Sequence, residues 1–124
     1  MGKPHCRGEF AQSGGLLKQW DIFTFDFESE GPHPVVIISS NARVRLKDRV
    51  NVLICSSQRA ARPPKVTELV LDTADGFDWP TLCKCDLSYL VPKAKLYQRR
   101  GAVSPTRRRA IFNTLLQSFE LHAL

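Results

Sequence analysis

The 124-residue sequence has no apolar run that approaches the roughly 18–20 residues needed to span a bilayer. Its opening stretch, "MGKPHCRGEFAQSGG", lacks the continuous apolar segment of a signal peptide. No internal repeat and no long linker interrupts the chain. With 43% hydrophobic and 24% charged residues, the composition is that of a globular domain. We therefore expect one soluble domain in the cytoplasm, with no membrane association.

A disulfide framework is not expected either, because the four cysteines would lie in the reducing cytoplasm. Cys83 and Cys85 can be read as half of a zinc site, with His5 and Cys6 as the other half. Their Cys-x-Cys spacing is shorter than the usual two-residue minimum of zinc-binding pairs. We therefore expect neither a metal nor a cofactor.

Acidic residues are outnumbered, since 12 Asp and Glu face 18 Lys and Arg, for a net charge of +6 and a pI of about 9.5. Many of the basic residues fall in groups, at 43–49, 59–65, 99–100 and 107–109. A basic surface is typical of a nucleic-acid-binding protein or of a protein with an acidic partner. An ordinary solvated face explains the same charge equally well.

Short segments with strand character fill most of the chain. Residues 21–27, "DIFTFDF", alternate apolar and polar side chains, which is typical of a half-buried strand. Residues 28–34, "ESEGPHP", predict a turn. Further strands are expected at 35–39, 50–57, 66–72 and 93–101, whereas 82–91 is ambiguous. Residues 1–18 are interpreted as a flexible N-terminal extension and 19–124 as the domain.

A C-terminal helix is predicted over residues 104–121. Ser104 suits the N-cap and Pro105 the first helical position. Ile111, Leu115 and Phe119 then recur on one face, and we expect them to be buried. Arg107–Arg109 occupy the first turn, where the helix dipole favours negative charge, so they are expected to face solvent or an anionic partner. The fold class predicted from these elements is mainly β, a small curled antiparallel sheet or barrel with one C-terminal helix.

The order of segments resembles that of the MazF/PemK (Kid) toxins of type II toxin–antitoxin systems. The segments that carry the resemblance are "WDIFTFDF", "GPHPVVIIS", "VNVLICSSQ", "LCKCDLSYLVPKAKL" and "RRGAVS" followed by the helix. The resemblance implies an SH3-like antiparallel barrel of the MazF/PemK/CcdB superfamily. It also implies a homodimer that cleaves single-stranded RNA without a metal and is neutralised by a cognate antitoxin.

Four residues match functional positions of this family. In the turn that reads Gly-x-Arg-Pro in the family, "GPHP" puts His33 in place of a catalytic arginine. "CSSQ" puts Ser56 in place of a catalytic threonine or serine. "KCD" matches Lys84 to the arginine of an Arg-x-Asp motif and keeps Asp86. The resemblance therefore implies that Asp86 is a base, His33 an acid or base, Lys84 a phosphate ligand and Ser56 a hydrogen-bond donor.

Further RNA contacts are expected at Ser57, Gln58, Arg59, Arg45 and Arg99. The family's early Gly-Asp-Ile reads Trp20-Asp21-Ile22 in this chain. Each candidate also has a structural interpretation: a histidine between prolines is commonly a turn residue, serines at a strand end commonly form caps, and Lys84 and Asp86 can form a surface ion pair.

Two functions are compatible with these residues. The first is a metal-independent endoribonuclease toxin. The second is a non-catalytic binding protein on the same fold, either a CcdB-like gyrase poison or an RNA- or antitoxin-binding protein without nuclease activity. The replacement of two family arginines by His33 and Lys84 favours the second function, whereas Asp86, Ser56 and the basic surface favour the first.

Overall fold

The computed structural model describes residues 17–57 and 62–119. Within these ranges the chain forms strands, two α-helices and two 3₁₀ turns. In chain order they are β1 (Asp21–Phe27), β2 (Gly31–Ile37), α2 (Asn41–Leu46), β3 (Arg49–Ser57), β4 (Glu68–Leu71), η2 (Thr73–Asp75), β5 (Thr81–Pro92), η3 (Lys93–Lys95), β6 (Tyr97–Ala102) and α3 (Pro105–Ser118).

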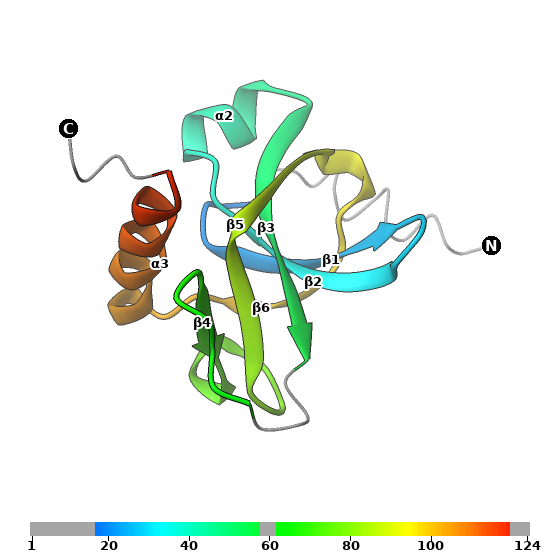
Figure 1. The fold of residues 1–124 in the computed structure, drawn as a ribbon. Coiled ribbons are helices and arrows are strands. Elements are labelled where there is room, and N and C mark those ends of the chain that lie inside the picture. Colours follow the sequence, from blue (N-terminus) through cyan, green and yellow to red (C-terminus); the bar gives the residue numbers. More distant parts are fainter. Residues whose placement is uncertain (1–16, 58–61, 120–124) are drawn as a thin grey trace.

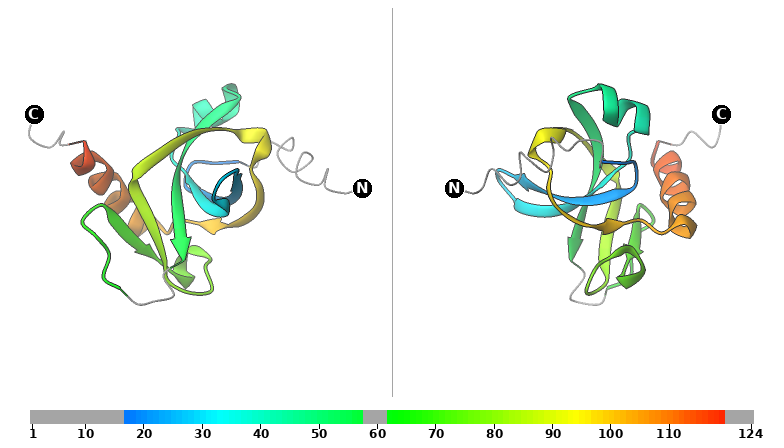
Figure 2. Two further views of the ribbon diagram at one scale, coloured as in Figure 1. Left: turned by 45° about the vertical axis from the view of Figure 1, so that its right-hand side comes forward. Right: turned by 180° about the vertical axis from the view of Figure 1, so that it is seen from behind.

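The six strands form one antiparallel sheet in the order β4-β5-β3-β2-β1-β6 (Figure 1). The sheet curls into a half-barrel, with α3 against its β4–β5 side and α2 at the start of β3 (Figure 2). This architecture confirms the predicted fold class. None of the described helices is long and apolar enough to cross a membrane.

Alternation along the strands divides the buried side chains between the two faces of the sheet. One cluster, which includes Ile22, Val36 and Leu53, is covered by Ile111 of α3. The second cluster includes the neighbours Phe23, Val35 and Val52, which point to the opposite face. Both faces of the central strands are therefore apolar, which explains why β2 and β3 are continuous runs of β-branched and aliphatic residues.

The β3–β5 pair contains a marked irregularity. Cys55 pairs with Cys83 and Leu53 with Ser88, so that four residues of β5, 84–87, face the single residue Ile54 of β3. Such a bulge bends the strand and redirects its side chains. Both Lys84 and Asp86 lie in it.

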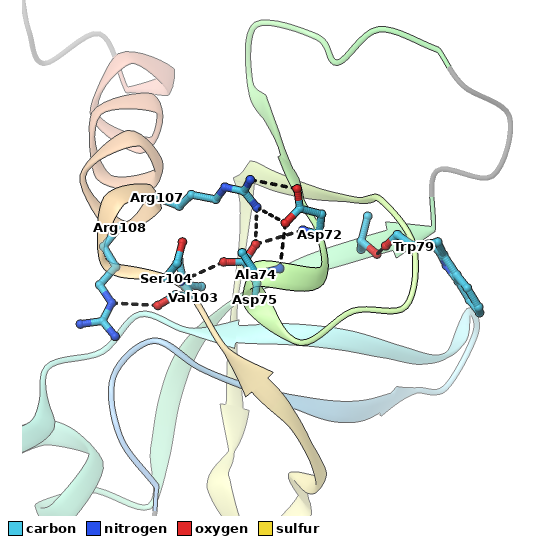
Figure 3. A network of polar contacts seen from close by, with 9 residues as sticks. Asp72, Ala74, Asp75, Trp79, Val103, Ser104, Arg107 and Arg108 are labelled. Carbon is cyan, nitrogen blue, oxygen red and sulfur yellow. Dashed lines mark hydrogen bonds and ion pairs between the residues drawn. The ribbon is translucent and has the colours of Figure 1, made fainter.

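Helix α3 is attached to the β4–β5 connection by Arg107. Its guanidinium donates to both carboxylate oxygens of Asp72, at 2.9 and 3.0 Å, and to Oδ2 of Asp75 (Figure 3). The buried Asp75 also accepts the backbone N–H of Ser104 at 2.8 Å. Asp72 and Asp75 thus bring negative charge to the first turn of α3, and Arg107 faces a carboxylate pair instead of solvent.

Several local predictions were wrong. His33 lies within β2, paired with Phe25, and not in a turn. Of the three helix residues expected to be buried, Ile111 is buried, Leu115 is only partly buried and Phe119 is 62% exposed. Helix α2 was not predicted.

The ends of the described chain refine the predicted boundaries. Helix α3 is described to Ser118, and the residues from 120 onward lie outside the described ranges, as do 1–16. Leu17, in the last part of the predicted extension, is 4% exposed and belongs to the second apolar cluster.

We expect Arg107→Leu to lower the free energy of unfolding by about 3 kcal/mol, because it leaves the buried Asp75 without its cationic partner. Arg109→Leu, in the exposed position two residues on, should change it by less than about 0.5 kcal/mol. Urea denaturation monitored by circular dichroism measures both. Equal losses in the two variants would show that the ion pair contributes no stability.

Candidate active site

His33 lies just beyond the last residue pair of β2 and β3, where its side chain contacts the backbone of β3. The last residue pair of this ladder is Val35 with Ile54, so the next would set Pro34 against Cys55. Proline has no N–H to give to a ladder. Instead, Nδ1 of His33 lies 3.1 Å from the carbonyl oxygen of Cys55. Because a carbonyl only accepts, Nδ1 carries the proton in this contact, and the neutral ring keeps its lone pair on Nε2.

Strand register places three of the predicted residues on one face. His33 shares its face with Val35, which pairs with Ile54, and Ser56 follows Ile54 by two residues. Ser56 pairs with Leu82, which precedes Lys84 by two. His33, Ser56 and Lys84 therefore come from the adjacent strands β2, β3 and β5 with the same orientation, and each is half-buried.

Lys84 has an anionic neighbour that the sequence analysis missed. It pairs across the β4–β5 ladder with Glu68, whose side chain is 5% exposed. Glu68 receives two hydrogen bonds from the guanidinium of Arg62, at 2.9 and 3.0 Å, and one from the N–H of Lys65. The Arg62 contact, the Lys65 N–H and the charge of Lys84 together lower the pKa of Glu68 to about 2. Lys84 thus faces a carboxylate that stays ionised at neutral pH.

Asp86 is exposed, in the bulge of β5 two residues beyond Lys84. The ion pairs between described residues do not include one between Lys84 and Asp86. The negative charge of Asp86 instead contributes to raising the pKa of the neighbouring Cys85 thiol. The carboxylate is open to solvent on a distorted stretch of strand.

The cysteines next to these residues are buried thiols. Cys55, Cys83 and Cys85 are free and fully buried. A hydrogen bond with Cys55, together with burial, raises the pKa of Cys83 well above its usual value; a hydrogen bond with Cys83 and burial do the same for Cys85. Thiols that stay protonated are poor nucleophiles. In residues 17–57 and 62–119, no three His, Cys, Asp or Glu side chains form a metal-binding group; His5 and Cys6 lie outside these ranges.

The predicted RNA-contact residues are dispersed. Arg45 is exposed on α2, which comes just before the first residue of β3, whereas Ser56 lies near the last residue of β3. Arg99 pairs with the buried Asp21 at 3.1 Å. Ser57 is exposed at the end of β3. Gln58 and Arg59 lie outside the described residues.

A cleft of about 220 Å³ opens beside His33 and contains residues that the sequence analysis did not select. It is lined by Pro32, His33, Pro34, Ser57, Phe77, Asp78, Trp79, Thr81 and Arg100. Four chain segments far apart in the sequence meet here, so no local sequence motif predicts the cleft. The dipeptide Asp78-Trp79 in a loop was the one available signal. Two other clefts, at Trp20 and Phe112 and at the tip of the β1–β2 hairpin, do not include His33.

The family described as "PemK-like, MazF-like toxin of type II toxin-antitoxin system" matches residues 18–119. The chain belongs to this family. The match covers most of the chain and includes His33, Ser56, Lys84 and Asp86. A search of curated proteins found no match.

Solved structures of MazF-type toxins share the fold. An endoribonuclease in complex with its cognate antitoxin, from a mycobacterial species, superposes with a TM-score of 0.75 at 21% identity, covering 86% of this chain and 97% of that one. The Mycobacterium tuberculosis toxin MazF-mt6 gives 0.70 at 19% identity, with 81% and 96% covered. MazE-MazF from Deinococcus radiodurans gives 0.65 at 12% identity, with 84% and 95% covered.

The ionised Glu68 predicts an acid-dependent loss of stability. Its pKa is about 2 in the folded protein against 4.5 ordinarily, so the unfolded chain binds its proton first as the pH falls. The stabilisation is present above about pH 4.5 and is lost toward pH 2. Urea denaturation across this window should therefore show a weaker pH dependence for Glu68→Gln than for the wild type. Glu28→Gln, which removes an exposed carboxylate, is the control and should keep the pH dependence of the wild type. Identical pH profiles of stability for the wild type and Glu68→Gln would show that the lowered pKa of Glu68 does not stabilise the fold.

Proposed function

We propose that this protein is the toxin of a toxin–antitoxin pair and cleaves single-stranded RNA without a metal, by attack of the 2′-hydroxyl on the adjacent phosphate. The observation that carries the proposal is the polarised imidazole of His33, with Nδ1 bound to the Cys55 carbonyl beside Ser56. Family membership and the endoribonuclease named among its structural relatives support the same reaction.

The reaction needs a base for the 2′-hydroxyl proton, an acid for the leaving 5′-oxygen and donors for the charge on the phosphorane. Asp86 is the proposed base, since its carboxylate is exposed to solvent in the bulge two residues beyond Lys84. Nε2 of His33 is the proposed proton-transfer atom for the leaving oxygen. The hydroxyl of Ser56 and the ammonium of Lys84 are the proposed phosphate ligands, with Lys84 acting as a point charge rather than a bidentate fork.

The proposed assembly is a homodimer neutralised by a cognate antitoxin, with RNA in a groove between the two copies. Among the solved relatives, one structure is a complex with a cognate antitoxin and another is a MazE-MazF complex. A half-barrel of this size offers only shallow clefts, and a second copy would extend them into a surface long enough for an RNA strand. Ser57, Arg45, Arg99, Gln58 and Arg59 are the proposed additional RNA contacts.

A binding protein without nuclease activity is the second candidate. The Glu68 carboxylate opposite Lys84 favours it, because it offsets the charge that a phosphate ligand would use. Incubation of the purified protein with mixed single-stranded RNA in EDTA separates the two functions. Cleavage that leaves 2′,3′-cyclic phosphate ends supports the nuclease, and intact RNA supports the binding protein.

Asp86→Asn should lower the cleavage rate about 10²–10⁴-fold while RNA affinity and folding stay nearly unchanged, because it removes a proton acceptor at constant volume. Single-turnover cleavage and filter binding measure the two quantities. Asp48→Asn, an exposed carboxylate between α2 and β3, is the matched control and should behave as the wild type. Wild-type cleavage by Asp86→Asn would overturn the proposed base.

His33→Asn tests proton transfer, because an amide can keep the hydrogen bond to the Cys55 carbonyl but has no counterpart of Nε2. Cleavage should fall at least about 100-fold and lose one limb of its pH dependence. His33→Arg, which restores the family residue, should also be slower. If His33→Arg matches or exceeds the wild type, the position stabilises phosphate charge and transfers no proton.

A further inference from the structure

The cleft beside His33 is lined by aromatic and charged side chains that have no role in the proposed catalytic steps. The indole of Trp79 is 42% exposed, and an acidic side chain, Asp78, and a basic one, Arg100, line the same space. Phe77 is 5% exposed, and the guanidinium carbon of Arg100 lies 6.0 Å from its ring centroid. The cleft thus combines flat surfaces for stacking with polar groups of both signs.

The loop that carries Asp78 and Trp79 is held at both ends. At its start, Asp72 accepts the N–H of Ala74 and donates its own N–H to Asp75, and Arg107 binds both carboxylates (Figure 3). At its end, the hydroxyl of Thr81 donates to the carbonyl of Trp79 at 3.1 Å.

Close backbone packing fixes the middle of the loop. A Cβ at Gly76, whose φ is +103°, would lie 2.5 Å from the carbonyl oxygen of Arg100, and a Cβ at Gly101 would lie 2.2 Å from that of Asp75. The loop and the Arg100 segment of β6 therefore touch directly. A pocket with fixed walls binds a ligand with less loss of conformational entropy.

We propose that this cleft is a nucleobase subsite for the nucleotide next to the cleaved phosphate, and that it selects guanine. The inference rests on the proposed function, because it places the base beside the histidine that acts on the phosphate. Proteins recognise unpaired bases by stacking them on aromatic rings or guanidinium planes and by hydrogen-bonding their Watson–Crick edges. Trp79 and Arg100 supply the surfaces, and Asp78 supplies the edge contact.

The carboxylate of Asp78 determines which base fits. It offers two acceptor oxygens and no donor. Guanine presents two adjacent donors, N1–H and the N2 amino group, which match both oxygens. Adenine and cytosine present one amino donor beside an acceptor nitrogen, and uracil presents one N–H between two carbonyls. Each of these three bases would set an acceptor against the second carboxylate oxygen.

Mapping of cleavage sites on a mixed RNA pool by sequencing the new 5′ ends tests the selection. The wild type should show guanine enriched at one position next to the cut, and Asp78→Asn should reduce that enrichment roughly tenfold without changing the other positions. Trp79→Ala should raise KM roughly tenfold at nearly constant kcat. The controls are Asp48→Asn and, for the aromatic, Phe112→Ala, which removes a ring that is 52% exposed on α3.

A binding measurement separates this inference from the proposed function. In a 2′-O-methyl oligonucleotide, which cannot be cleaved by 2′-hydroxyl attack, exchanging the selected guanine for inosine removes only the N2 amino group. The exchange should weaken binding to the wild type roughly tenfold and leave binding to Asp78→Asn unchanged. If no cleavage is observed, no cleavage site is available from which to choose the oligonucleotide. It is then chosen from the sequences that the protein binds out of a random 2′-O-methyl pool.

Guanine-dependent binding that requires Asp78, without cleavage, would support the subsite and refute the nuclease. Cleavage whose base profile is the same in wild type, Asp78→Asn and Trp79→Ala would overturn the subsite and leave the nuclease standing. A pool that shows no guanine enrichment with the wild type, in cleavage or in binding, would also overturn the subsite.

Discussion

The position of α3 relative to the β4–β5 connection depends on the ion pair of Arg107 with Asp72 and Asp75. This pair joins the first turn of α3 to the connection between β4 and β5, two segments that share no strand pairing. The side chain of Asp75 is fully buried, so the pair is sheltered from the screening that weakens surface ion pairs. Its hydrogen bonds to Asp72 and Asp75 raise the pKa of Arg107. The hydrogen bonds from Arg107 and from the N–H of Ala74 lower the pKa of Asp72, so both groups stay charged. The loop leading to Trp79 and the helix that carries Ile111 are thereby placed together.

Local pattern was enough to predict much of the fold. Alternation identified residues 21–27 as a strand, the aliphatic runs identified the core of β2 and most of β3, and Ser104-Pro105 marked the start of α3. The failures have physical causes. Helix α2 has only six residues, too few for a periodic signal, although the hydroxyl of Ser40 caps it. Phe119 continues the spacing of the apolar stripe, but α3 ends at Ser118, so Phe119 is the C-cap residue and its ring is exposed.

The residues of the candidate site could be predicted from the sequence, but their contacts with the rest of the molecule could not. Family resemblance selected His33, Ser56 and Lys84, and the register gives all three the same orientation. The partners of these residues could not be foreseen, because they come from tertiary contacts. Glu68 faces Lys84 only because β4 pairs with β5 in one particular register, and Arg62 reaches Glu68 from the preceding loop. Arg107 was expected to face solvent or an anionic partner. Its two carboxylate partners could not be foreseen because they lie 35 and 32 residues away in the chain.

The contact between His33 and the Cys55 carbonyl has a consequence for the proposed proton transfer. Nδ1 donates in this contact when the ring is neutral and when it is doubly protonated, since only Nε2 changes between the two states. The proposed transfer of a proton through Nε2 therefore leaves intact the hydrogen bond between Nδ1 and the Cys55 carbonyl. The proposed reaction then requires no change in the pairing of β2 with β3 at this position.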